Sequence, residues 1–111
     1  MALLIIRADV EGNIIALVGD VEAILGWDPE ELLGKPVVEI IPFRYRERHA
    51  AGWKRWCTTG QKMAMGSWMK VEARRADGNE ISVSFCVTER EGTVQAIMEA
   101  PATSRLPTLN E

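Results

Sequence analysis

The stretch 63-MAMGSWMKVEARRADGNEISVSFCV-87 alternates between apolar and polar side chains on both sides of the central Asp77-Gly78-Asn79. A period of two residues places alternate side chains on opposite faces of a β-strand, and Asp-Gly favours a tight hairpin turn. The stretch therefore predicts two antiparallel strands that share one mainly apolar face. The side chains predicted on that face are Met65, Ser67, Met69, Val71, Ile81, Val83, Phe85 and Val87.

Strand patterns also occur nearer the two ends of the chain. LLIIRA at residues 3–8 and NIIALV at residues 13–18 are β-prone runs joined by a turn at Gly12-Asn13. TVQAIMEA at residues 93–100 predicts a last strand, which follows a turn in the sequence EREGT. With the central hairpin, these segments predict five strands joined by local, antiparallel connections.

Two short helices are predicted between the first hairpin and the middle of the chain. Asp20 is placed to cap the first of them and Gly26 to end it. Asp28 is placed to cap the second, with Pro29 at the first helical position and Gly34 as the stop.

The longest helical pattern covers residues 44–59 and ends at Gly60. At about 100° per residue, the only histidine, His49, lies at the centre of an apolar stripe, with most charged side chains on the far side. The aromatic residues that share this stripe are Tyr45, Trp53 and Trp56. We therefore expect His49 to point into the protein.

This order of elements predicts an α+β fold. We expect a five-stranded antiparallel sheet, with several short helices and one longer helix packed on one face and a small pocket between the long helix and the strands. We place a single domain at residues 1–100. Residues 101–111 are polar and interrupted by proline, which is typical of a linker or a frayed end.

The composition narrows the classes of function. Thirteen basic and 16 acidic residues give a net charge of −3, which does not favour nucleic-acid binding. No run of 18 apolar residues is present, and Cys57 and Cys86 fit neither a metal spacing nor a disulfide framework, so we expect a cytoplasmic protein. We find no nucleophile beside a general base and no glycine-rich phosphate loop, so we expect a protein without catalytic activity.

The order of these elements, together with four short strings, resembles a PAS domain over roughly residues 3–100. The strings are DVEGNII at 9–15, ILGWDPEELLGK at 24–35, IIP at 40–42 and ADGNEISVSF at 76–85. The resemblance implies a bacterial-type sensory or interaction module, usually one part of a signalling protein and often a homodimer. The partner it implies is therefore a second copy or another signalling domain, with a small-molecule ligand as a further possibility.

Within that family, RERHAAGWKRWCTTGQ at residues 46–61 resembles the haem-bearing oxygen sensors of the FixL type. The resemblance implies that His49 is an axial ligand of haem iron and that Arg55 contacts a haem propionate. The chain departs from those sensors at Met69, where they carry an arginine that donates a hydrogen bond to oxygen. Some haem-bearing relatives use a methionine ligand two positions earlier, where this chain has Ser67.

Each of these residues also has a structural interpretation. His49 is either an iron ligand or a core histidine, and Trp53 and Trp56 either line a cofactor or fill the volume that a porphyrin would need. Met65 and Met69 are either ligands or core residues. The basic side chains Arg44, Arg46, Arg48, Lys54 and Arg55 form either a solvated face or a site for an anionic ligand.

We therefore predict a sensory domain that associates with itself or a partner and binds a small ligand in its core. The alternatives are a haem-based gas or redox sensor and a domain with a noncovalent flavin. Trp68 is expected on the outer face of the sheet, where it would suit a dimer surface unless the chain covers it. The predicted pocket residues are His49, Trp53, Arg55, Trp56, Met65, Ser67, Met69, Phe85 and Val87, with His49 as the only metal ligand.

Overall fold

The computed structural model describes residues 2–59, 68–90 and 92–100. It contains a five-stranded sheet in the order β2-β1-β5-β4-β3, in which every neighbouring pair is antiparallel. The strands are β1 (Ala2–Ala8), β2 (Ile14–Gly19), β3 (Trp68–Arg74), β4 (Glu80–Arg90) and β5 (Thr93–Ala100). The helices are α1 (Val21–Leu25), α2 (Pro29–Leu32), the short 3-10 helix η1 (Val37–Ile40) and α3 (Phe43–Thr59).

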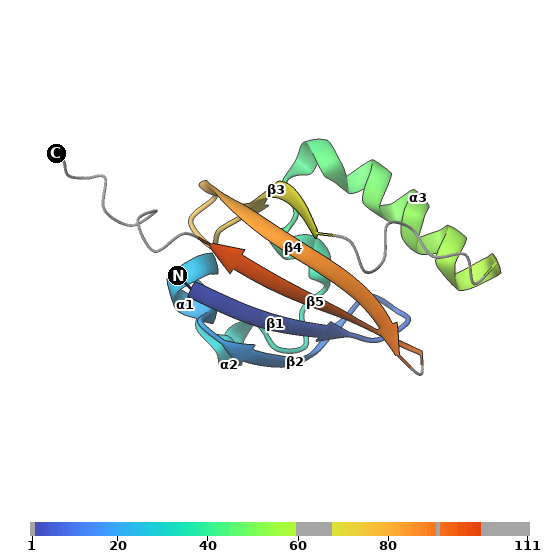
Figure 1. Cartoon of the computed structure of the whole chain (residues 1–111), viewed down its shortest axis with the longest axis horizontal. Coiled ribbons are helices and arrows are strands. Elements are labelled where there is room, and N and C mark those ends of the chain that lie inside the picture. Colours follow the sequence, from blue (N-terminus) through green and yellow to red (C-terminus); the bar gives the residue numbers. More distant parts are fainter. Residues whose placement is uncertain (1, 60–67, 91, 101–111) are drawn as a thin grey trace, which may run out of the picture.

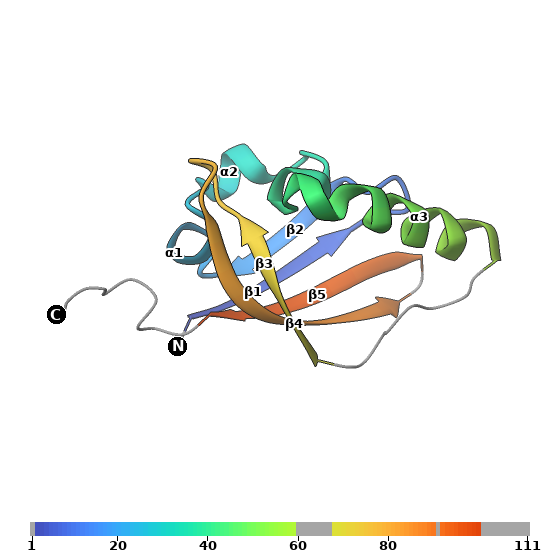
Figure 2. The same ribbon diagram turned by 90° about the horizontal axis from the view of Figure 1, so that it is seen from above.

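The helices lie on one face of the sheet, and α3 is the longest of them (Figures 1 and 2). This arrangement confirms the predicted α+β class. The predicted tail at 101–111 and the start of the 63–87 stretch lie outside the described residues. Within the described part of the chain, no helix combines the length and the apolar character needed to cross a membrane.

The two short helices begin in different ways. Asp28 caps α2 as predicted, because its side chain accepts a hydrogen bond from the backbone N–H of Glu30 at 2.9 Å. Asp20 occupies the N-cap position of α1 as predicted, but its side chain makes no capping hydrogen bond. Its carboxylate instead accepts a hydrogen bond from the backbone N–H of Leu3 at 3.0 Å, which fastens the start of α1 to β1.

Glycine permits the close approach of β1 and β2. Gly19 has a φ of +107°, and a Cβ at this position would lie 2.4 Å from the carbonyl oxygen of Leu3. A side chain there would therefore collide with the neighbouring strand, so the sheet requires glycine at this position.

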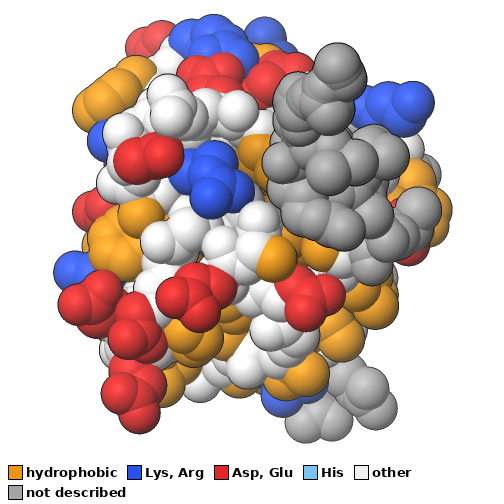
Figure 3. Space-filling view, turned by 90° about the vertical axis from the view of Figure 1, so that its left-hand side faces the viewer, with side chains coloured by type: hydrophobic (Ala, Val, Ile, Leu, Met, Phe, Trp, Pro, Cys, Tyr) orange, Lys and Arg blue, Asp and Glu red, His pale blue; other side chains and the backbone are white. Residues whose placement is uncertain are grey.

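The core lies between the sheet and the short helices. Its fully buried members come from β1, β2, α1 and α2, so the first third of the chain supplies most of the tight packing. These members are Leu4, Ile14, Val21, Ile24, Leu25 and Leu32. The end of the molecule shown in Figure 3 carries acidic and basic side chains interspersed with hydrophobic ones, with acidic groups most evident at its lower left. This end of the molecule is therefore not a basic surface.

Candidate functional site

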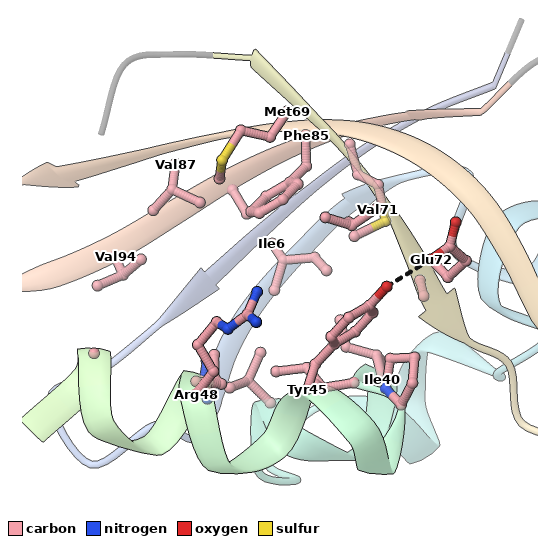
Figure 4. Close-up of a pocket in the computed structure, with 18 of the residues that line it drawn as sticks. Ile6, Ile40, Tyr45, Arg48, Met69, Val71, Glu72, Phe85, Val87 and Val94 are labelled. Atoms are coloured by element: carbon pink, nitrogen blue, oxygen red, sulfur yellow. Dashed lines mark hydrogen bonds between the residues drawn. The ribbon is translucent and has the colours of Figure 1, made fainter. Parts of the chain in front are cut away.

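A cavity of about 560 Å³ lies between α3 and the inner face of the sheet (Figure 4). The sheet and the segment before α3 supply its apolar wall, which consists of Ile6, Ala8, Val37, Ile40, Ile41, Pro42, Met69, Val71, Ala73, Phe85, Val87, Val94, Ala96 and Met98. The other lining residues are Tyr45, Arg48, His49, Gly52, Trp53, Lys70 and Glu72. A predominantly apolar cavity with a few polar groups is the usual form of a small-molecule site.

His49 lines this cavity from α3 and is half-buried. Its ring lies against the Trp53 ring, with 5.5 Å between the ring centroids and a tilt of 34°. Burial lowers the pKa of His49 below its ordinary value of 6.5, because the charged imidazolium is poorly solvated there. His49 therefore presents a neutral imidazole to the cavity near neutral pH.

Trp53 fixes the middle of α3 to the β1–β2 turn. Its indole N–H donates a hydrogen bond to the carbonyl oxygen of Val10 at 2.8 Å. The Cys57 thiol, one turn further along α3, lies 3.6 Å from the same oxygen. The turn is itself ordered, since the Asp9 carboxylate accepts a hydrogen bond from the backbone N–H of Asn13 at 3.0 Å. Trp53 thus lines the cavity in a position that its hydrogen bond to this turn fixes.

Polar contacts fasten the first turn of α3 to the edge of the sheet. The Tyr45 hydroxyl donates to a Glu72 carboxylate oxygen at 2.7 Å, as Figure 4 shows. Arg44 donates to the same oxygen at 3.2 Å and to both oxygens of Glu80 at 2.6 and 2.8 Å. The hydrogen bonds from Arg44 lower the pKa of Glu80 and raise that of the guanidinium. Glu72 is thus a lining carboxylate that already has hydrogen-bond partners within the protein.

Arg48 extends from α3 toward the strands in Figure 4 and lines the cavity, although the residue as a whole is exposed. It therefore lies where the cavity meets solvent. Arg48 combines the two interpretations given for the basic side chains, since the residue is exposed and also lines the cavity. Its Cα lies about 100° around the helix from His49, outside the apolar stripe, and the length of the side chain brings the guanidinium to the cavity.

The predicted site residues fall into three groups. His49, Trp53, Met69, Phe85 and Val87 line the cavity together. Arg55 is exposed and does not line it. Met65, Ser67 and the side chain of Trp56 lie outside the described part of the structure.

The predicted site does not contain three polar residues that line the cavity, namely Tyr45, Lys70 and Glu72. Tyr45 was recognised on the apolar stripe of the helix but not as a ligand-facing group. Glu72 lies on an edge strand, and only the packing of α3 against that edge brings it to the cavity. Among the described residues, no group of three or more His, Cys, Asp or Glu side chains could hold a metal ion.

A second surface is formed by an apolar row across the outer face of the sheet. The strand registers align one residue from each strand, in the order Val18, Ile5, Ile97, Cys86 and Trp68. Val18 and Trp68, at the two ends of the row, are 61% and 52% exposed. The row next to it contains Glu99, Ser84 and Lys70 and is mainly polar. We call the set of Val18, Ile5, Ile97, Cys86 and Trp68 the outer row.

A sequence profile of the PAS fold family matches residues 1–101. An uncharacterized protein of Azorhizobium caulinodans is 35% identical over 97 residues, which cover 86% of this chain and 13% of that protein. The chain therefore spans about an eighth of the length of this relative.

Solved structures of PAS domains share the fold. The PAS domain of the Cronobacter turicensis quorum-sensing receptor RpfR, solved in complex with BDSF, has a TM-score of 0.66 and 17% identity, over 88% of this chain and 92% of that one. The PAS domain of a protein from Colwellia psychrerythraea has a TM-score of 0.65 and 16% identity, over 91% of this chain and 87% of that one. The profile match covers nearly the whole described chain, and the strand order and helical layer agree with it. The chain belongs to the PAS fold family.

Proposed function

We propose that this domain is a non-catalytic sensory module that binds a small, largely apolar molecule between α3 and the sheet. The observation that carries the proposal is the apolar cavity of about 560 Å³, a volume within the range of ligand sites. The RpfR PAS domain was solved both with BDSF and with C12:0, which supports a small-molecule ligand for a domain of this fold. A cytoplasmic location stays a prediction.

Binding of an uncharged apolar probe tests this proposal. We expect 1-dodecanol to change the fluorescence of Trp53, which lines the cavity, in a saturable titration. Val87→Phe should abolish the change, because the added ring occupies the cavity. Thr88→Phe adds the same ring at the next position of β4, on the opposite face, and should leave binding intact. A titration that does not saturate, or equal binding by both variants, would contradict the proposal.

Haem is the alternative ligand. His49 supplies a neutral imidazole in an apolar cavity, as an iron ligand requires, and Met69 lines the same cavity. However, Arg55, the predicted partner of a propionate, lies outside the cavity. Because only part of the predicted haem contact set is assembled, we favour an organic ligand without iron.

Titration with hemin decides between the two ligands. A stoichiometric Soret band that His49→Ala removes would establish haem. A yellow protein with a flavin spectrum would instead establish the flavin alternative.

We also propose that the domain associates with itself through the outer row. The observation that favours this is the alignment of five apolar side chains across all five strands, with exposed Val18 and Trp68 at its ends. Ile5 and Ile97 are half-buried and Cys86 is buried, so the exposed apolar surface lies at the two ends of the row. Large exposed apolar side chains of this kind are typical of an interaction surface.

Sedimentation velocity tests self-association. We expect a concentration-dependent dimer whose dissociation constant rises at least about tenfold in Trp68→Ala, since large aromatic side chains dominate such interfaces. Leu33→Ala, which truncates a side chain 49% exposed beside α2, is the matched control and should leave the profile unchanged. A monomeric wild-type protein at all concentrations would refute this second proposal.

A further inference from the structure

The cavity opening carries a charge that the protein does not balance. Resting on the proposed ligand-binding function, we infer that the ligand is an amphipathic acid whose carboxylate is held by Arg48 while its apolar part enters the cavity.

The other described arginines near α3 and the strand edge have partners within the protein. Arg44 pairs with Glu72 and Glu80. Arg46 donates to the carbonyl oxygen of Ile41 at 2.8 Å, and its guanidinium carbon lies 4.0 Å from the centroid of the Phe43 ring. Arg75 donates to the carbonyl oxygen of Ile24 at 2.7 Å.

Arg48 differs from these arginines. It makes no hydrogen bond or ion pair with any residue that the structure describes, although it lies beside the apolar wall. A guanidinium is always charged and presents a fork of N–H donors that matches a carboxylate. Its direction in Figure 4, from α3 toward the strands, turns those donors toward a molecule in the cavity.

The one lining carboxylate does not compete for Arg48. Glu72 accepts hydrogen bonds from Tyr45 and Arg44 through the same oxygen, at 2.7 and 3.2 Å. The first turn of α3 therefore already supplies its hydrogen-bond partners, and Arg44 is shared with Glu80. Lys70 also lines the cavity, but its strand position places it beside the outer row, on the other face of the sheet. Arg48 is the lining cation whose side chain extends toward the strands in Figure 4, and its charge, unpaired among the described residues, favours an anion.

The rest of the cavity excludes a small hydrophilic anion as the best ligand. Met69, Phe85, Val87 and Val94 line the space into which Arg48 points (Figure 4). These side chains offer no hydrogen bonds to a polar molecule but stabilise apolar surface by about 25 cal/mol per Å² buried. An acid with an alkyl or similar apolar tail can bind the Arg48 guanidinium through its carboxylate and bury its tail against these apolar side chains.

Two probes that differ only in the head group test the inference. Dodecanoate and 1-dodecanol share the tail, and isothermal titration at about pH 8 keeps the acid ionised. We expect wild-type protein to bind dodecanoate more tightly than dodecanol. Arg48→Gln should weaken dodecanoate binding about tenfold or more, because a charge-assisted hydrogen bond is lost, and change dodecanol binding less than about twofold. Arg48→Lys should restore part of the difference.

Arg55→Gln is the matched control, because it removes the same charge from the same helix at an exposed position outside the cavity. It should leave the preference for dodecanoate unchanged. Equal binding of both probes by wild-type protein, or equal losses in Arg48→Gln and Arg55→Gln, would overturn the carboxylate assignment while the ligand-binding function stands. If neither probe binds to the wild-type protein, the proposed function itself fails, and the inference fails with it.

Discussion

His49 shows how a single half-buried side chain couples the stability of the fold to pH. Its pKa is lowered by burial, whereas in the unfolded chain it returns to about 6.5. Between these two values the unfolded state binds more protons than the folded state. Stability rises with pH wherever the unfolded state binds more protons. His49 therefore lowers the free energy of unfolding as the pH falls below about 6.5.

We therefore predict that the free energy of unfolding of the wild-type protein falls between about pH 7 and pH 5. His49→Gln, which has no titrating group at this position, should show a shallower decline. Urea unfolding across this pH range measures both slopes. Identical slopes would mean that His49 is as well solvated as in the unfolded chain, contrary to its half-buried position.

Gly19 and Gly34 provide a matched pair of residues for backbone strain. Both have positive φ, +107° and +91°, so alanine at either position costs about 1–2 kcal/mol in the left-handed region. Only at Gly19 does the new Cβ also meet backbone, 2.4 Å from the Leu3 carbonyl oxygen, whereas nothing lies within 4 Å at Gly34. We predict that Gly19→Ala lowers the free energy of unfolding clearly more than Gly34→Ala, as measured by urea denaturation. Equal losses would show that the two strands separate easily at this point.

At the scale of elements, α3 is attached to the rest of the domain at two places. Tyr45 and Arg44 join its first turn to β3 and β4, and Trp53 joins its middle to the β1–β2 turn. The cavity lies under the segment between these attachments. The helix is therefore held at defined points across a space that a ligand can fill.

Tyr45→Phe tests the first attachment. The variant keeps the ring and removes the hydroxyl that donates to Glu72, so we predict a loss of about 1 kcal/mol in the stability of the first turn of α3. Amide hydrogen exchange should become faster in that turn and stay unchanged in β1. Unchanged exchange in α3 would show that the Arg44 contacts alone hold the turn.

Local patterns predicted these elements well. The period of two around Asp77-Gly78 predicted the β3–β4 hairpin, and the stripe around His49 predicted a helix whose inner side lines a cavity. Asp20 holds the predicted N-cap position, but its carboxylate binds the backbone of β1 instead of the first turn of α1. The outer row and the Tyr45–Glu72 contact also follow from strand registers and from distant packing, which no short segment of sequence contains.

At the scale of the whole molecule, ligand binding and stability are linked. A ligand that binds only the folded state at a hundred times its dissociation constant adds about 2.7 kcal/mol to the free energy of unfolding. For a domain of this size we predict that saturating dodecanoate raises Tm by roughly 10 °C in differential scanning fluorimetry. Val87→Phe should show no such rise. A wild-type Tm that does not respond would indicate that the probe does not bind to the folded protein.

The position of β1 between β2 and β5 has a consequence for synthesis. β1 pairs with β5 along its whole length, from Ala2 opposite Ala100 to Ala8 opposite Val94. During translation the chain leaves the ribosome N-terminus first. The edge of β1 that pairs with β5 therefore stays unpaired until nearly a hundred residues have followed. Contacts of such long sequence separation form slowly, and exposed strand edges promote aggregation. We therefore expect nascent chains that stop before β5 to depend on chaperones, and the domain to become independent of them only when its last strand emerges.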